Sequence, residues 1–149
     1  MTERRQERDL LLTPFFQADD WATLDLVTSP RAPNPGDTVD LDVAAEGDAL
    51  RQALLLRLLT PVGALRDLGH ASYGSRLGEL IGFPNTRQAR QLARSYVIQA
   101  IAQERRVAKI LDLTIAEPEQ LTMDRLSIFI RVLPATNLPP VSLSLEVAL

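Results

Sequence analysis

The sequence predicts an α+β domain, and two observations support this prediction. A long amphipathic helical pattern spans residues 85–104, and three runs that alternate apolar and polar residues follow it. Loops of modest length, 116–124 and 134–140, join these runs and favour a three-stranded antiparallel sheet at the C-terminal end. We expect the helix to cover this sheet, because the apolar face of a sheet must be buried against another element.

Length and composition indicate one globular domain. The chain has 149 residues, of which 46% are hydrophobic and 23% are charged, as in proteins with a buried core. We expect residues 1–20 to form an N-terminal arm and residues 21–149 to form a single domain. The charged start, Met1 to Arg8, is not followed by a long apolar stretch, so we expect neither a secretory signal nor a membrane span.

The residues before the long helix predict a hairpin, a first helix and a glycine-rich connector. Two alternating stretches flank a proline- and glycine-rich run, 29–37, which is typical of a hairpin with a long loop. Asp48 can cap a helix that continues to about Leu59, and Pro61 prevents it from going further. The connector that follows contains glycines at positions 63, 69, 74, 78 and 82.

The long helix has a predicted start and a predicted buried face. Asn85 is a suitable N-cap, and Gln88 stands three residues later, as in a capping box. Apolar residues then recur at the i, i+3, i+4 spacing of an amphipathic helix. We expect this face to contact the sheet through Leu92, Tyr96, Val97 and Ile101, packed on Leu111, Leu113, Ile128 and Ile130.

The sequence contains no pattern typical of a catalytic or metal site. No glycine-rich phosphate-binding motif occurs, there is no cysteine, and His70 is the only histidine. We therefore predict no catalytic residue, no metal ligand and no cofactor. A glycosidase needs only a pair of carboxylates, and sequence spacing cannot select such a pair among the candidates Glu79, Glu104, Asp112 and Glu117.

The basic residues are unusual in an acidic chain. The formal net charge is −3, and Lys109 is the only lysine among 16 basic residues. A negative net charge gives no general attraction for nucleic acid. Arg87, Arg90 and Arg94 nevertheless share one face of the long helix, either as a solvated face or as a site for an acidic partner or RNA.

The last predicted strand has no feature that would protect its edge. It alternates strictly through Val141, Leu143, Leu145 and Val147, and it contains neither proline nor lysine. Two interpretations stay open: another strand of the same sheet covers this edge, or a partner chain adds a strand to it.

Four stretches between residues 40 and 115 occur in an order that is found in a known family. They are Gln52, Leu58, Leu59, Thr60 and Gly63, then Tyr73, Gly74, Ser75 and Leu77, then the helix 85–104, and finally Glu104 and Arg106. In this order they resemble the contractile-tail baseplate wedge proteins, a family that includes phage protein W and the T-even lysozyme-like wedge protein. Relatives of this family occur in type VI secretion and extracellular injection systems. Arg105 stands where the family usually has a proline, which puts the rigid turn in doubt.

The resemblance implies a structural subunit without enzymatic activity. Such a subunit would bind the helical bundle of the larger baseplate wedge proteins and seat the first ring of the sheath protein, in multiple copies, with six expected. It would assemble in the bacterial cytoplasm into a virion tail or injection particle, with neither nucleic acid nor membrane as a partner. The implied partner-binding residues are Glu104 and Arg106 at the helix–strand junction, together with the three helix arginines and the four apolar residues of the last strand.

Two other classes remain as alternatives. One is a lysozyme-like peptidoglycan hydrolase, which would use a carboxylate pair. The other is a small regulatory or RNA-binding module that would use the arginines of the long helix.

Overall fold

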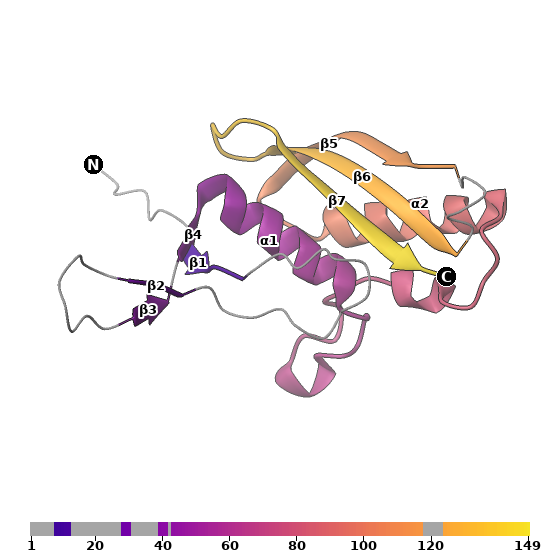
Figure 1. Cartoon of the computed structure of the whole chain (residues 1–149), viewed down its shortest axis with the longest axis horizontal. Coiled ribbons are helices and arrows are strands. Elements are labelled where there is room, and N and C mark those ends of the chain that lie inside the picture. The colour runs from indigo at the N-terminus through magenta and orange to yellow at the C-terminus, as the bar shows by residue number, and fades with distance from the viewer. Residues whose placement is uncertain (1–7, 13–27, 31–38, 42, 118–123) are drawn as a thin grey trace. The chain divides into compact units, whose positions relative to one another are not determined.

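The structure is a computed structural model that describes residues 8–12, 28–30, 39–41, 43–117 and 124–149 (Figure 1). The chain divides into two units, Met1–Gln52 and Ala53–Leu149, which we describe separately. Residues 1–7 and 13–20 of the predicted arm, and the alternating stretch that was predicted before the run 29–37, lie outside the described residues.

The first unit contains two pairs of short strands. Strand β2 (Thr28–Pro30) pairs antiparallel with β3 (Val39–Leu41), which confirms a hairpin in this region. Ser29 and Pro30 of β2 were predicted to belong to the loop of that hairpin and are part of its strand instead. Strand β1 (Arg8–Leu10) pairs antiparallel with β4 (Val43–Ala45). Part of the predicted arm is therefore a strand, and the alternating run from Val39 is divided between two pairs.

The side chain of Gln52 links β1 to the first helix, α1 (Glu46–Leu59). Its Nε2 donates to the carbonyl oxygen of Leu10 at 2.8 Å, and its Oε1 accepts from the backbone N–H of Leu12 at 2.8 Å. One amide group thus satisfies two backbone groups, one in the last residue of β1 and one two residues later. Helix α1 begins at Glu46, two residues before the predicted cap Asp48, which instead forms an ion pair with Arg51.

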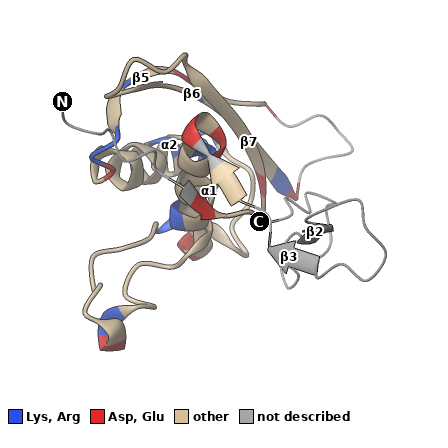
Figure 2. Ribbon diagram, turned by 90° about the vertical axis from the view of Figure 1, so that its left-hand side faces the viewer, with Lys and Arg blue, Asp and Glu red and all other residues tan. Residues whose placement is uncertain are grey.

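The second unit has the predicted α+β architecture. Helix α2 (Arg87–Ala102) precedes strands β5 (Val107–Ile115), β6 (Arg125–Pro134) and β7 (Val141–Ala148), which form an antiparallel sheet in the order β5-β6-β7. Figures 1 and 2 show α2 and the second half of α1 on the same side of this sheet. Neither of these helices combines the length and the apolar character that a bilayer crossing requires.

The core of this unit lies between the helices and the inner face of the sheet. Alternate residues of β6 and β7 are buried, as the period of two predicts, and Leu126, Ile128 and Val132 of β6 are fully buried. The second half of α1 adds Leu54 and Leu58. Helix α2 contributes Ala89, Ala93, Val97, Ala100 and Ile101.

Two residues predicted in the core are exposed instead. Leu92 is 44% exposed, because the buried row of α2 runs through positions 89, 93, 97 and 101 and leaves Leu92 beyond its edge. Leu111 is 43% exposed, because the pairing register of β5 shifts between Ile110 and Asp112. Such a bulge interrupts the alternation that the prediction assumed.

The predicted capping box of α2 is also wrong. Thr86 is the N-cap, with an extended backbone and a hydroxyl that accepts from the N–H of Ala89 at 3.2 Å. The amide of Asn85 serves tertiary contacts instead. Its Nδ2 donates to the carbonyl oxygen of Arg125 at 2.9 Å, and its Oδ1 accepts from Arg90 at 3.0 Å.

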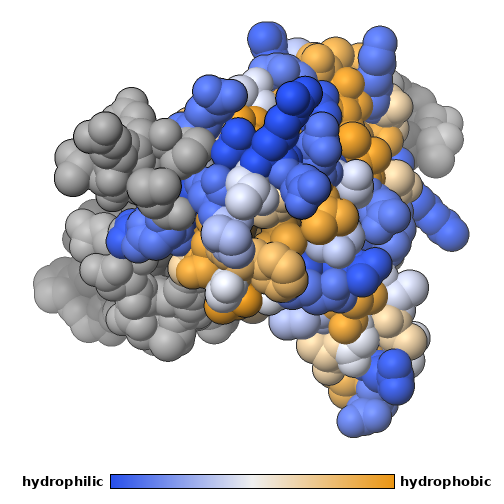
Figure 3. All heavy atoms as spheres, turned by 90° about the vertical axis from the view of Figure 1, so that its right-hand side faces the viewer, coloured by the Kyte–Doolittle hydropathy of each residue, from blue (hydrophilic) through white to orange (hydrophobic). Residues whose placement is uncertain are grey.

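The connector between the helices projects from the unit, as the lower parts of Figures 1 and 3 show. It contains two short 3-10 helices, η1 (Arg66–Leu68) and η2 (Leu77–Leu80). Ser75 joins the second half of the connector to the end of α1. Its hydroxyl donates to the carbonyl oxygen of Leu58, and its backbone N–H donates to the carbonyl oxygen of Thr60 at 2.8 Å. Leu68, near the far end, is 72% exposed.

Candidate partner-binding site

The predicted pair Glu104 and Arg106 lies in a tight turn between α2 and β5. The N–H of Val107 donates to the carbonyl oxygen of Glu104 at 3.1 Å, as in a β-turn. Arg105 therefore occupies the second position of the turn, which is the position that proline favours. The turn forms here without the proline that is usual in the family that the sequence resembles.

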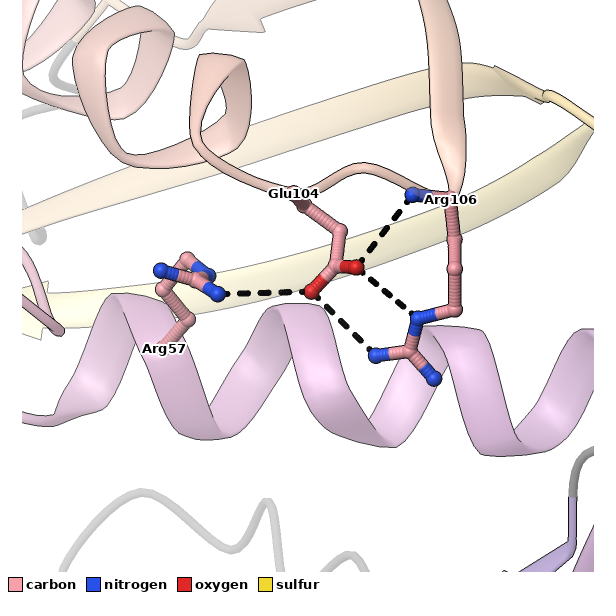
Figure 4. Close-up of polar contacts among 3 residues, drawn as sticks. All are labelled: Arg57, Glu104 and Arg106. Atoms are coloured by element: carbon pink, nitrogen blue, oxygen red, sulfur yellow. Dashed lines mark hydrogen bonds and ion pairs between the residues drawn. The ribbon is translucent and has the colours of Figure 1, made fainter.

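The carboxylate of Glu104 lies between two guanidinium groups (Figure 4). Its Oε1 accepts from Nε of Arg106 at 2.8 Å, and its Oε2 accepts from Nη2 of Arg106 at 3.2 Å and from Nη2 of Arg57 at 3.4 Å. The side chain of Glu104 is only 10% exposed and that of Arg57 only 12%. Glu104 therefore binds within its own chain, and the exposed part of this cluster belongs to Arg106.

These contacts change the acidity of Glu104. The hydrogen bond from the Arg106 guanidinium is the main cause that holds the pKa of Glu104 below its usual value, and the positive charges of Arg106 and Arg57 add to it. Burial acts in the opposite direction, because it disfavours the charged carboxylate. The net effect is a carboxylate that stays ionised at neutral pH.

Sequence reasoning did not find Arg57 as a member of this cluster. Its Cζ lies 4.4 Å from the centre of the Tyr73 ring, a cation–π contact at the base of the connector. Arg57 is 47 positions from Glu104 in the sequence, so no local pattern could pair them. Tyr73 had a signal, since it belongs to one of the motifs on which the resemblance rests.

Two of the three predicted helix arginines donate to acceptors within the chain. Arg90 donates to Asn85, and Nη1 of Arg94 donates to the carbonyl oxygen of Leu113 in β5 at 2.7 Å. Arg87 is exposed at the start of α2. The structure thus does not present the three guanidinium groups as one uniform solvated surface.

The four apolar residues predicted in the last strand are buried in the core of their own unit. Val141, Leu143, Leu145 and Val147 are 2–6% exposed and face the helices. The N–H of Leu149 donates to the carbonyl oxygen of Asp124, which continues the β6–β7 ladder and shows that odd-numbered residues of β7 bond to β6.

The even-numbered residues of β7 therefore direct their backbone groups away from β6. Ser144 and Glu146 lie in the middle of this row, with exposed side chains on the outer face of the sheet. Among the described residues no strand pairs with this edge of β7. A strand that paired with this edge would bond to the backbone of Ser144 and Glu146.

Two candidate carboxylates lack the property that the general acid of glycoside hydrolysis requires. Glu79 forms a two-bond pair with Arg76, at 2.8 and 2.7 Å, and this hydrogen bonding lowers the pKa of Glu79. Glu104 also has a lowered pKa. A general acid needs a raised pKa to hold its proton at neutral pH. Within the described ranges, no group of three or more histidine or acidic side chains is placed to hold a metal ion.

Comparison with protein-family models, curated proteins and solved structures finds no match to this chain. The resemblance to the baseplate wedge family therefore rests on the motifs in the sequence. In the structure, Tyr73 and Glu104, which belong to two of these motifs, both contact Arg57, which is not itself among the matching residues. Tyr73 contacts Arg57, and Arg57 and Arg106 bind the same carboxylate of Glu104.

Proposed function

We propose that this chain is a structural baseplate wedge subunit of a contractile injection system or phage tail. In this role it joins the helical bundle of the larger wedge proteins to the first ring of the sheath. It would act in several copies, six in a six-fold baseplate, after assembly in the bacterial cytoplasm. The observation that supports this proposal best is the regular outer edge of β7.

The geometry of β7 suits the addition of a partner strand. Its pairing with β6 runs from Val141 to Ala148 without a register shift, and it contains no proline or lysine. The backbone groups of Ser144 and Glu146 can therefore bond to an extended segment of the sheath protein. The buried face fixes the register of β7 itself, because a slip by one residue would expose all of its apolar side chains.

The cluster around Glu104 supports a second contact, with the larger wedge proteins. The side chain of Arg106 is 32% exposed, although it binds Glu104 on one side. A guanidinium can bind a carboxylate of a partner through two parallel hydrogen bonds, and the guanidinium of Arg106 is held in place by Glu104. Arg106 is the most exposed member of this cluster, and replacing it would also remove two hydrogen bonds from the buried carboxylate of Glu104.

The proposal can be tested with two substitutions at one exposed position. Ser144→Pro removes a backbone donor from the outer edge of β7, whereas Ser144→Ala keeps that donor and changes only the side chain. We expect Ser144→Pro to fold, as judged by circular dichroism, but to yield baseplates without sheath in electron micrographs of particles. Ser144→Ala should yield sheathed particles. Sheathed particles of normal length from a folded Ser144→Pro chain would refute sheath docking through β7.

The two alternative functions can be examined with the same purified protein. Hydrolysis of purified peptidoglycan above the level of a heat-inactivated sample would favour the lysozyme-like function. Filter binding to RNA that weakens steeply with added salt would favour the RNA-binding module, because phosphate contacts release counterions. We expect neither result from a structural subunit.

A further inference from the structure

The sheet of the second unit has two edge strands, and the two edges differ. Strands β5 and β7 each pair with β6 on one side only, among the described residues. A small sheet with two open edges can pair edge to edge with further copies of itself. If β7 of one copy met β5 of the next, the contact would be head-to-tail and could continue without closing.

The hydrogen-bond ladder shows which groups β5 presents at its outer edge. The N–H of Ala116 donates to the carbonyl oxygen of Ser127 at 2.9 Å, in register with the pair Thr114 and Phe129. Even-numbered residues in this part of β5 therefore bond to β6. The backbone groups of Leu113 and Ile115 point away from β6, because bonded and non-bonded pairs alternate in an antiparallel ladder.

Arg94 occupies this outer edge. Helix α2 contacts β5, and Nη1 of Arg94 donates to the outward-facing carbonyl oxygen of Leu113 at 2.7 Å. The bond is charge-assisted and therefore stronger than a bond between neutral groups. A strand that approached β5 here would have to displace the guanidinium and would meet a positive charge held beside the ladder.

We infer that Arg94 closes the β5 edge against a second copy of this chain. Of the two edges of the β5-β6-β7 sheet, the β7 edge then remains the regular one, so this sheet can accept a further strand next to β7 but not next to β5. Irregular pairing assists Arg94, since the register of β5 shifts between Val107 and Lys109 and again between Ile110 and Asp112. This inference concerns self-association and does not depend on the proposed baseplate function.

The test compares Arg94→Ala with Arg87→Ala, which removes an exposed arginine from the same helix. The mass of each purified full-length chain is measured by light scattering across a concentration series. We expect the mass of Arg94→Ala to rise with concentration to about twofold or more above the wild type, because head-to-tail pairing does not close. Arg87→Ala should follow the wild type. Equal masses for all three proteins would overturn the inference.

A second variant separates edge pairing from simple misfolding. Adding Ser144→Lys to Arg94→Ala places a charge at the β7 edge without altering the backbone. We expect this double variant to return to the mass of the wild type, with an unchanged circular dichroism spectrum. If the double variant associates as strongly as Arg94→Ala alone, head-to-tail pairing through β7 and β5 is wrong.

Discussion

Arg57 and Glu104 form an ion pair in the interior of the second unit, with Nη2 of Arg57 located 3.4 Å from Oε2 of Glu104. The same carboxylate binds Arg106, so one negative charge serves two positive charges. Replacing Glu104 would leave the two guanidinium groups without their common partner. Glu104 was predicted to bind another protein, but because its side chain is buried and paired within the chain, it contributes to the stability of the fold.

We predict that Glu104→Gln lowers the free energy of unfolding by about 1–3 kcal/mol at pH 7. The loss should be below the roughly 3–5 kcal/mol of a fully buried pair, because Arg106 is partly exposed. Because the folded-state pKa of Glu104 is lowered, its contribution is complete above the unfolded pKa of about 4.3. That contribution disappears as the pH falls through the folded-state pKa.

Urea denaturation from pH 7 to pH 3 tests this prediction. The difference in stability between wild type and Glu104→Gln should be constant near neutral pH and should narrow below about pH 4. A difference that stays constant down to pH 3 would show that the charge of Glu104 does not stabilise the fold.

We predict that Ile101→Ala and Ile128→Ala each lower the free energy of unfolding by about 2–5 kcal/mol, because both side chains are buried and their removal leaves a cavity. Leu92→Ala is the control on the same helix, with an expected change within about 0.5 kcal/mol because Leu92 is largely exposed. Urea midpoints measure all three. Midpoints of Ile101→Ala and Ile128→Ala equal to that of Leu92→Ala would mean that α2 does not cover the sheet.

Two glycines of the connector allow a matched comparison. Gly74 has φ of +113°, and a Cβ at this position would collide with the carbonyl oxygen of Thr60. We therefore expect Gly74→Ala to destabilise the chain by at least about 1–3 kcal/mol, the usual cost of a strained backbone. Gly78→Ala meets no atom within 4 Å and should be close to neutral. Thermal unfolding compares the variants, and similar melting temperatures would contradict a tight base of the connector.

The predictable parts of the fold are those with an uninterrupted local pattern. The pairing of β6 with β7 runs without a register shift, so the alternation around Ile128 and Leu143 identifies both strands and their buried faces. The pairing of β5 has two register shifts, and the prediction for Leu111 was wrong for that reason. The predicted cap of α2 was wrong by one residue, because Asn85 and Thr86 are both residue types that favour the N-cap. The side chain of Asn85 instead donates a hydrogen bond to the carbonyl oxygen of Arg125.

In the candidate site, too, the features that could be predicted are those with a local sequence pattern. The sequence by itself determined the position of Glu104 and Arg106 after a helix and before a strand, and the regularity of β7, because these depend on residues close together in the chain. Only the tertiary structure decided that Arg57 meets Glu104 across 47 positions and that Arg94 reaches Leu113 across 19. The physical reason is that periodicity reports which face of an element is buried, whereas such pairs depend on how separate elements pack together.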